Sequence, residues 1–380
     1  MAYGRSTEEG FISVRGFSLI EAMIALALGT AIILGVTTTF TDSSRALNDI
    51  SRAGRQIETG LYAMDLLARE LVLVDYWGEA SAPVDADDPL YGPLREAEVS
   101  GLEVGLAPAV PALCVGTGAT GDDPRVELAW AMEYPLLVGL GSELNNAVSM
   151  DQCKLDASTA SADSAFAAIR RASTCATGSD GIAEMNHCDV PEDFFYLQTN
   201  GCYDDNAGLS GGEIKLYRTT EAEMSTTLNY MRYGCDAGQS EANGGFAPIY
   251  RYVSRIYYVS QTDRLVRLAL RKNRNGELGY QQEIMAEGIE TLQFEWFIDD
   301  TGDGEYDRVL SALSYEDASN VVGAKIWLVV RDLNPRPTRA DEAVYTVAGK
   351  RWRAPEGKGA YSRTVHSRVV ALPNRVGRRR

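Results

Sequence analysis

The longest feature in the hydrophobic pattern is an apolar run over residues 17–40, which contains one charged side chain, Glu21, near its start. A helix needs about 20 apolar residues to cross a bilayer, and no other run in the sequence is as long and as apolar. A carboxylate inside an apolar span costs roughly 2.5 kcal/mol or more unless it finds a partner. The run therefore predicts a membrane-spanning helix in which Glu21 needs a charged partner.

The pattern becomes amphipathic after residue 40. Apolar or small residues recur at alternating spacings of three and four, which is the period of a heptad seam. The seam consists of Leu47, Ile50, Gly54, Ile57, Leu61, Met64, Ala68 and Leu71. We predict one helix over residues 17–77, transmembrane over 17–40 and amphipathic over 41–77, with a length of about 90 Å at about 1.5 Å per residue. Such a seam can pair with a second chain in a coiled coil or pack against a sheet of the same chain.

Strand-like runs dominate the last third of the chain. They are rich in aromatic and β-branched residues and are separated by turn signals such as residues 273–276. The runs cover residues 251–259, 263–271, 290–298, 324–331, 343–347 and 363–372. We predict an antiparallel sheet over residues 248–380 that can cover the apolar stripe of the helix.

An acidic segment, residues 78–247, separates the helix from this sheet. Gly, Asn, Asp and Ser are frequent in it, as is typical of loops, and only two short strand-like runs stand out, at residues 101–106 and 126–132. Residues 75–250 hold 28 Asp and Glu against 8 Lys and Arg, whereas residues 325–380 hold 4 against 14. The whole chain has a formal net charge of -17, so we expect no nucleic acid partner.

All six cysteines of the chain lie in the acidic segment: Cys114, Cys153, Cys175, Cys188, Cys202 and Cys235. Their even number, irregular spacing and lack of a Cys-x-x-Cys pattern favour disulfides over a zinc site. About 15 pairings are possible, so the connectivity stays open, and proximity alone points to Cys175 with Cys188 and Cys202 with Cys235. Disulfides indicate an oxidising compartment outside the cytoplasm.

Residues 1–16 precede the apolar run and are mostly polar. They carry Arg5 and Arg15, and positive charge before a first helix favours a cytoplasmic location for that end. An ordinary secretory signal is the alternative, but its apolar region spans only about 7–15 residues. That alternative also gives no reason for Glu21.

The hexapeptide Gly-Phe-Ser-Leu-Ile-Glu at residues 16–21 resembles the processing site of type IV prepilins and type II secretion pseudopilins. The resemblance implies that residues 1–16 are a leader peptide, which prepilin peptidase removes by cleavage after Gly16. It also implies that Phe17 is N-methylated and that the apolar run is retained. Glu21 then becomes the fifth residue of the mature chain and pairs with the N-terminal amine of a neighbouring subunit, a charge pair that is strong in a low dielectric.

The C-terminal part is similar to the PilW type of minor pilin. The similarity lies in a Tyr-Tyr strand at Tyr257, a segment at residues 287–293, an Asp/Gly-rich turn and a last strand that ends near Asn374. Pro373 departs from the Arg that the family pattern has before the Asn. The similarity implies an α+β, type IV pilin-like fold: one long N-terminal helix packed on a C-terminal antiparallel sheet, with a large disulfide-containing insertion between them. It thus favours packing of the seam on the protein's own sheet.

The Asp/Gly-rich turn allows two interpretations. Asp299, Thr301, Asp303 and Asp307 stand at positions one, three, five and nine of a calcium-binding loop, and a glycine stands at position six. Leu310 occupies position twelve, where such a loop has a bidentate Glu. The alternative is a solvated hairpin turn, for which Asp-Gly is a strong signal. Calcium is the one cofactor that the sequence suggests.

The resemblance implies a structural subunit rather than an enzyme: a minor pilin of a type IV pilus, incorporated at the tip or initiation complex. Such a protein supports pilus assembly, adhesion or twitching motility. Its partners would be other minor and major pilins, prepilin peptidase, the inner-membrane assembly platform and a PilY-type tip adhesin. It would reside in the inner membrane of a Gram-negative bacterium, with its head in the periplasm, and then in a surface pilus.

Two alternatives remain open at this point. A type II secretion minor pseudopilin of the J kind shares the same processing site. A membrane-anchored periplasmic enzyme or lectin is the other, although the sequence holds no Gly-x-Ser-x-Gly, no His-Glu-x-x-His and no phosphate-binding loop. The two histidines, His187 and His366, are not spaced with carboxylates in any pattern that indicates catalysis.

Overall fold

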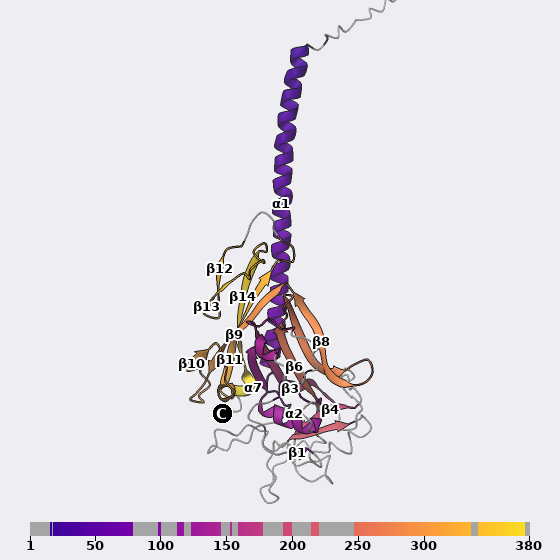
Figure 1. Ribbon diagram of the computed structural model, residues 1–380, viewed down its shortest axis with the longest axis vertical. Coiled ribbons are helices and arrows are strands. Elements are labelled where there is room, and N and C mark those ends of the chain that lie inside the picture. Colours follow the sequence, from indigo (N-terminus) through magenta and orange to yellow (C-terminus); the bar gives the residue numbers. More distant parts are fainter. Residues whose placement is uncertain are drawn as a thin grey trace, which may run out of the picture. The chain divides into compact units, whose positions relative to one another are not determined.

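The computed structural model describes eleven parts of the chain. They are residues 16, 18–78, 98–99, 112–117, 123–145, 153, 159–177, 193–199, 214–219, 247–335 and 341–376. The chain divides into two compact units, residues 1–55 and residues 56–380. The first unit contains the N-terminal part of helix α1 (Leu19–Val72), and the second, the head, contains the end of α1 and the strands (Figure 1).

Helix α1 has 54 residues, two fewer at its start and five fewer at its end than the predicted helix over residues 17–77. No proline interrupts residues 19–72, so each main-chain N–H can find its partner one turn back. The helix gives way to a turn in which Asp75 has a φ of 64° and Gly78 a φ of 79°. The prediction of one long N-terminal helix is confirmed.

The head buries one stripe of α1. The buried residues are Gln56, Gly60, Ala63, Met64, Leu67, Ala68, Glu70 and Leu71. Packing on the protein's own sheets is therefore confirmed, but the predicted seam is only partly the buried face, because Ile57 and Leu61 are 47% and 58% exposed. The buried positions follow the 3.6-residue period of a straight helix, which drifts away from a strict heptad.

The larger sheet has eight strands in the order β1-β5-β4-β6-β3-β2, with β7 and β8 continuing from β6. Its members are β1 (Glu98–Val99), β2 (Leu136–Leu140), β3 (Ala165–Thr177), β4 (Phe194–Thr199), β5 (Ile214–Thr219), β6 (Ile249–Val259), β7 (Arg264–Lys272) and β8 (Leu278–Glu287). Only β1 and β5 pair in parallel among the described strands. Five of these strands come from the acidic segment, so this segment is part of the sheet rather than an addition outside it.

The smaller sheet is antiparallel, with the order β10-β9-β11-β14. It consists of β9 (Ile289–Ile298), β10 (Arg308–Leu310), β11 (Val321–Arg331) and β14 (Arg363–Ala371), and a separate hairpin joins β12 (Val344–Val347) to β13 (Lys350–Arg353). Leu328 of β11 lies opposite Leu292 of β9 and His366 of β14. The six predicted C-terminal runs correspond to β6, β7, β9, β11, β12 and β14.

The prediction of a strand over residues 126–132 is wrong. These residues belong to helix α2 (Pro124–Glu133), which Asp123 caps by accepting a hydrogen bond from the main-chain N–H of Arg125. Proline at the first helical position is typical of a helix start. The other predicted run, residues 101–106, lies outside the described residues. The described residues also form the short helices α3 (Gly141–Leu144), α6 (Tyr315–Ala318) and α7 (Pro373–Val376).

The main core of the head lies between α1 and the inner faces of both sheets. Met64, Leu67 and Leu71 of α1 pack there with residues of both sheets, including Ile169, Tyr257, Ile326 and Leu328. A second core, around Trp77 and Tyr252, lies between the larger sheet and α2. The long helix is thus held on antiparallel sheets by apolar burial, as the predicted α+β fold requires.

Candidate functional site

The N-terminal part of α1 carries the residues of the predicted processing and assembly site. Gly16 is described and has no atom within 4 Å of a Cβ built on it, whereas Phe17 lies outside the described residues. Glu21 lies in the first turn of α1, where a carboxylate interacts favourably with the positive end of the helix dipole. The roles of these residues in cleavage, methylation and subunit contact stay predictions.

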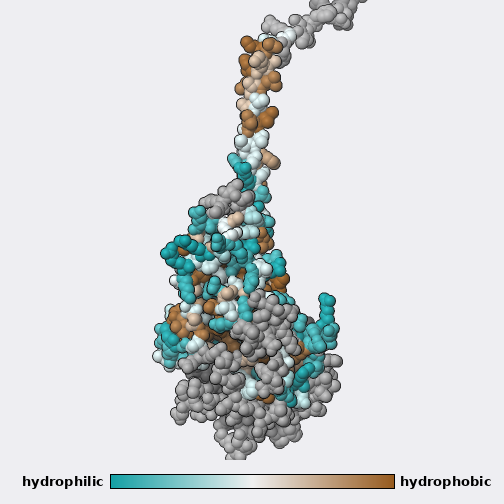
Figure 2. All heavy atoms as spheres, viewed as in Figure 1, coloured by the Kyte–Doolittle hydropathy of each residue, from teal (hydrophilic) through white to brown (hydrophobic). Residues whose placement is uncertain are grey.

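Large apolar side chains of this part of α1 are exposed. Their exposed fractions range from 56% for Ile24 to 82% for Leu19, and Phe40 is 72% exposed. Figure 2 shows them as the hydrophobic spheres along the helix. The most apolar 18-residue window has a mean hydropathy of 2.3, with none of it buried inside the protein. Because an exposed apolar surface of this size is unfavourable in water, it must be covered by a bilayer or by other protein.

The hydroxyl groups of this segment bond within the helix itself. Thr37 donates to the carbonyl oxygen of Ile33 at 2.7 Å, Thr39 to that of Gly35 at 2.9 Å, and Thr41 to that of Thr37 at 2.8 Å. These groups therefore need no water, which is the requirement for a polar side chain in an apolar environment. Sequence reasoning had treated the threonines only as part of the run.

An uncovered apolar stripe follows on the same helix. Leu47, Ile50 and Leu61 are 68%, 69% and 58% exposed, and Gly54 between them has open space where a Cβ would lie. Of the predicted seam positions within the head, Ile57 and Leu61 are the ones that stay exposed. A second helix can approach closely at such a stripe, because heptad spacing keeps the contact positions in line.

Three of the six cysteines lie within the described residues, and all three are in disulfides. Cys114 and Cys153 form a disulfide with their Cα atoms 5.1 Å apart, and Cys175 is also disulfide-bonded. Cys188, Cys202 and Cys235 lie outside the described residues, so the proximity pairings stay predictions.

Arg170 supports the disulfide segment and was missed by sequence reasoning. Its guanidinium group is fully buried and donates to the carbonyl oxygens of Tyr134 at 2.8 Å and Leu113 at 3.2 Å, and also to that of Ala112. Burial lowers its pKa from the ordinary value. The side chain ties the end of α2 to the residues that precede Cys114.

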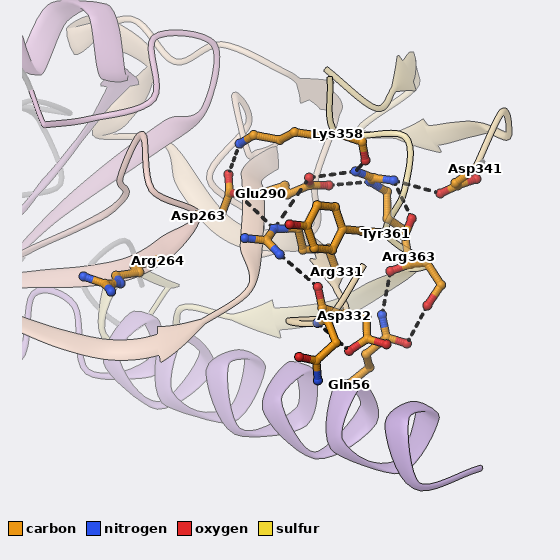
Figure 3. A network of polar contacts seen from close by, with 12 residues as sticks. Gln56, Asp263, Arg264, Glu290, Arg331, Asp332, Asp341, Lys358, Tyr361 and Arg363 are labelled. Carbon is orange, nitrogen blue, oxygen red and sulfur yellow. Dashed lines mark hydrogen bonds and ion pairs between the residues drawn. The ribbon is translucent and has the colours of Figure 1, made fainter. Parts of the chain in front are cut away.

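A network of polar contacts lies where β7, β9, β11 and β14 meet (Figure 3). Arg363 donates to Glu290 through two nitrogens, one contact being 2.9 Å, and both side chains are at most 1% exposed. Arg331 donates to Asp263 at 2.9 Å, and Lys358 binds the other oxygen of Asp263. Acidic and basic groups alternate in this network, so each buried charge has a partner, as burial demands.

The network extends to the β12–β13 hairpin. Tyr345 donates its hydroxyl to Asp341, which also accepts from Arg363 at 3.1 Å (Figure 3 shows Asp341). Burial and the adjacent carboxylate raise the pKa of Tyr345 to about 12. The network thus fixes the hairpin to the smaller sheet.

In the Asp-rich turn, two of the predicted calcium ligands, Asp299 and Asp307, accept hydrogen bonds from main-chain N–H groups. Both oxygens of Asp299 accept from main-chain N–H groups, those of Gly302 at 2.6 Å and Gly304 at 2.9 Å. Asp307 accepts from the N–H groups of Asp300 and Thr301. Within the described residues no three Asp, Glu, His or Cys side chains form a group that could hold a metal ion. The calcium site, with Asp303 exposed, stays an untested prediction.

These features define a pilin-like fold: a long N-terminal helix, apolar and exposed in its first part, packed in its second part on antiparallel sheets. Residues 256–374 match the family described as "Type IV Pilus-assembly protein W". Over this C-terminal segment, about a third of its length, the chain is similar to the PilW family.

Two further comparisons concern individual proteins. A type IV-like pilin from Thermus thermophilus is similar in structure, with 17% sequence identity over 37% of this chain and 75% of that one, at a TM-score of 0.20. None of the curated proteins matches the chain.

Proposed function

We propose that the chain is a minor pilin of a type IV pilus. Prepilin peptidase cleaves it after Gly16 and methylates Phe17, and the mature chain joins the tip or initiation complex of the filament. The protein supports pilus assembly, adhesion or twitching motility and has a structural rather than an enzymatic role.

The observation that carries this proposal is the uncovered apolar surface of α1 in a PilW-type chain. Its first part is exposed over residues 19–40 with its hydroxyls bonded internally, so it suits a bilayer before assembly and a protein interior afterwards. The exposed stripe from Leu47 to Leu61 continues this surface beyond the membrane span.

Glu21 is the assembly contact in this proposal. Before assembly it lies near the cytoplasmic side of the membrane, where water limits the cost of its charge. In the filament it pairs with the amino group of Phe17 in a neighbouring subunit, which aligns the two helices. This pairing accounts for the single carboxylate, Glu21, in an otherwise apolar segment.

The proposal places the chain in the inner membrane of a Gram-negative bacterium, with the head in the oxidising periplasm, and then in the surface pilus. Its partners are other minor and major pilins, prepilin peptidase, the assembly platform and a PilY-type tip adhesin. The disulfide between Cys114 and Cys153 suits that compartment.

A type II secretion pseudopilin of the J kind is the second candidate, because residues 16–21 suit both systems. The match to a pilus-assembly family over residues 256–374 favours the pilus. Deletion of the gene separates the two: loss of twitching with intact protein secretion supports the pilus, and the reverse supports the pseudopilin.

The test uses mass spectrometry of purified filaments from cells that carry the wild-type chain, Gly16→Val or Glu21→Ala. We expect the wild-type chain in filaments at low copy number, starting at methylated Phe17. Gly16→Val is expected to remain full-length in the membrane, and Glu21→Ala to be processed but depleted from filaments. Glu58→Ala, an exposed acid on the same helix, is the matched control and should be incorporated normally. Normal incorporation of both variants would refute the proposal.

A further inference from the structure

The β12–β13 hairpin has two unlike faces. Tyr345 and Trp352 are cross-strand partners with ring centroids 6.0 Å apart, and the guanidinium of Arg363 lies 5.9 Å from the Trp352 ring. Val347 on the same face is 2% exposed. Since side chains alternate along a strand, this inner face is fixed to the rest of the head.

The outer face of the hairpin consists of the residues that alternate with those of the inner face along β12 and β13. Arg351 pairs across the strands with Thr346, and Arg353 pairs with Val344. All four side chains are exposed, Val344 by 41%.

These cations have no acidic partner within the part of the chain that the structure describes. The ion pairs in the described part of the head involve other bases, among them Arg331, Lys358 and Arg363 in the neighbouring network. The chain has 53 Asp and Glu against 36 Lys and Arg, so acid is in excess. Arg351 and Arg353, both exposed and without an acidic partner among the described residues, are therefore available to an acidic group of another molecule.

The geometry points to an extended partner. Arg351 and Arg353 are two residues apart on one face, which separates their Cα atoms by about 6.6 Å. Carboxylates at alternate positions of another extended segment have the same spacing, so two ion pairs can form in register. Val344 adds an apolar contact beside them.

We propose that the outer face of this hairpin, formed by Val344, Thr346, Arg351 and Arg353, is a docking surface for an acidic, extended segment of another protein chain. Exposed Glu342 and Glu356 flank it, and they would repel a densely charged anionic surface such as a bilayer or nucleic acid. A segment with only two carboxylates can contact Arg351 and Arg353 without placing further negative charge beside Glu342 and Glu356. This surface is separate from the apolar part of α1, so the inference does not depend on the role of Glu21.

Site-specific photo-crosslinking in cells tests the proposal with the full chain. A photoreactive amino acid replaces Thr346, the cross-strand partner of Arg351, and crosslinked peptides are identified by mass spectrometry. We expect crosslinks to a protein segment that carries acidic residues at alternate positions. In the Arg351→Glu/Arg353→Glu background the yield should fall roughly tenfold, because opposite charges become like charges at the contact.

Two controls make the result specific. The same photoreactive residue at Asn275, on the exposed β7–β8 turn, should not give this crosslink, and Arg274→Glu should leave the yield at Thr346 unchanged. Equal thermal unfolding midpoints of the wild type and the double variant show that the fold is intact. Crosslinks to lipid, to an acid-poor segment, or with a yield insensitive to charge reversal would overturn the proposal, as would their absence from piliated cells.

Discussion

Gly60 of α1 lies directly against the imidazole ring of His366 in β14, so close that a methyl group at position 60 would overlap the ring. Helix and strand can approach this far only because residue 60 has no side chain. Nearby, Arg368 of β14 forms an ion pair with Asp65 of α1 at 3.3 Å. The contact between Gly60 and His366 is therefore one of the places where strand β14 packs against helix α1.

We expect Gly60→Ala to lower the free energy of unfolding by about 1–3 kcal/mol, because the added methyl group overpacks a filled site. Denaturant unfolding of the full chain in detergent measures this loss. Gly54→Ala is the matched control: the site is open, and alanine favours helix by up to about 1 kcal/mol over glycine. An equal gain in both variants would show that helix propensity, and not the His366 contact, decides the effect.

His366 makes the stability of the head depend on pH. Burial lowers the pKa of this imidazole from its ordinary value of 6.5, and within the described residues its Nε2 atom has no hydrogen-bond partner. The unfolded chain therefore binds a proton at a higher pH than the folded chain. Stability is full above pH 6.5 and falls as the pH drops below that value, until the folded-state pKa is passed.

We expect His366→Gln to remove most of the pH dependence of unfolding between about pH 7.5 and 5.5, the range around the ordinary pKa of histidine. Unfolding free energies at several pH values measure it, with His187→Gln as the control. Hydrogen bonds from Arg125 and Arg218 lower the pKa values of Asp123 and Asp193 below 3.8, so their contributions are lost only in stronger acid. An unchanged slope in His366→Gln would contradict this assignment.

The buried pair of Glu290 and Arg363 predicts a larger effect. Glu290→Gln leaves the guanidinium of Arg363 buried with only part of its partners, and such a change costs about 3–5 kcal/mol. Urea unfolding should show this loss, and Glu290→Leu with Arg363→Met should recover part of it. Glu287→Gln removes the exposed partner of Arg264 and should change stability by less than about 1 kcal/mol. Similar losses of unfolding free energy in Glu290→Gln and Glu287→Gln would mean that burial does not decide how much an ion pair contributes to stability.

The sequence predicted the long helix and the C-terminal strands because their signals are local. An uninterrupted apolar run and alternating β-branched residues depend on no distant partner. The strands of the acidic segment were missed for a physical reason. In β3 the alternation is hidden by small residues and by the buried charge of Arg170, whose partners come from residues 112–134 and only meet it in the fold.

The wrong strand over residues 126–132 and the partly wrong seam have different causes. The first had a local signal, since Asp123 before Pro124 is typical of a helix start. The second had none, because Leu61 and Met64 look alike in sequence and only the position of the sheets decides that Met64 is buried. The predicted assembly contact Glu21, in contrast, comes from a motif, and the fold adds only that its side chain is exposed.

The Asp-rich turn supplies the last prediction. Asp299 has no exposed surface and accepts hydrogen bonds from the N–H groups of Gly302 and Gly304, so its carboxylate holds the turn through these two contacts. Asp299→Asn turns one acceptor oxygen into a donor that faces an N–H group, and we expect a loss of about 1–3 kcal/mol. Asp303→Asn keeps the oxygen that accepts from the N–H group of Glu305 and should be nearly neutral.

Unfolding measured with and without millimolar calcium then separates the two interpretations of the turn. If the N–H groups are the partners of Asp299, calcium changes the unfolding midpoint of neither the wild type nor Asp299→Asn. A rise that is seen in the wild type and lost in Asp299→Asn would instead show that the carboxylates turn towards a bound ion, because a ligand that binds only the folded state raises its stability. In that case Asp307 must release the N–H groups of Asp300 and Thr301, and Asp307→Asn should abolish the rise as well.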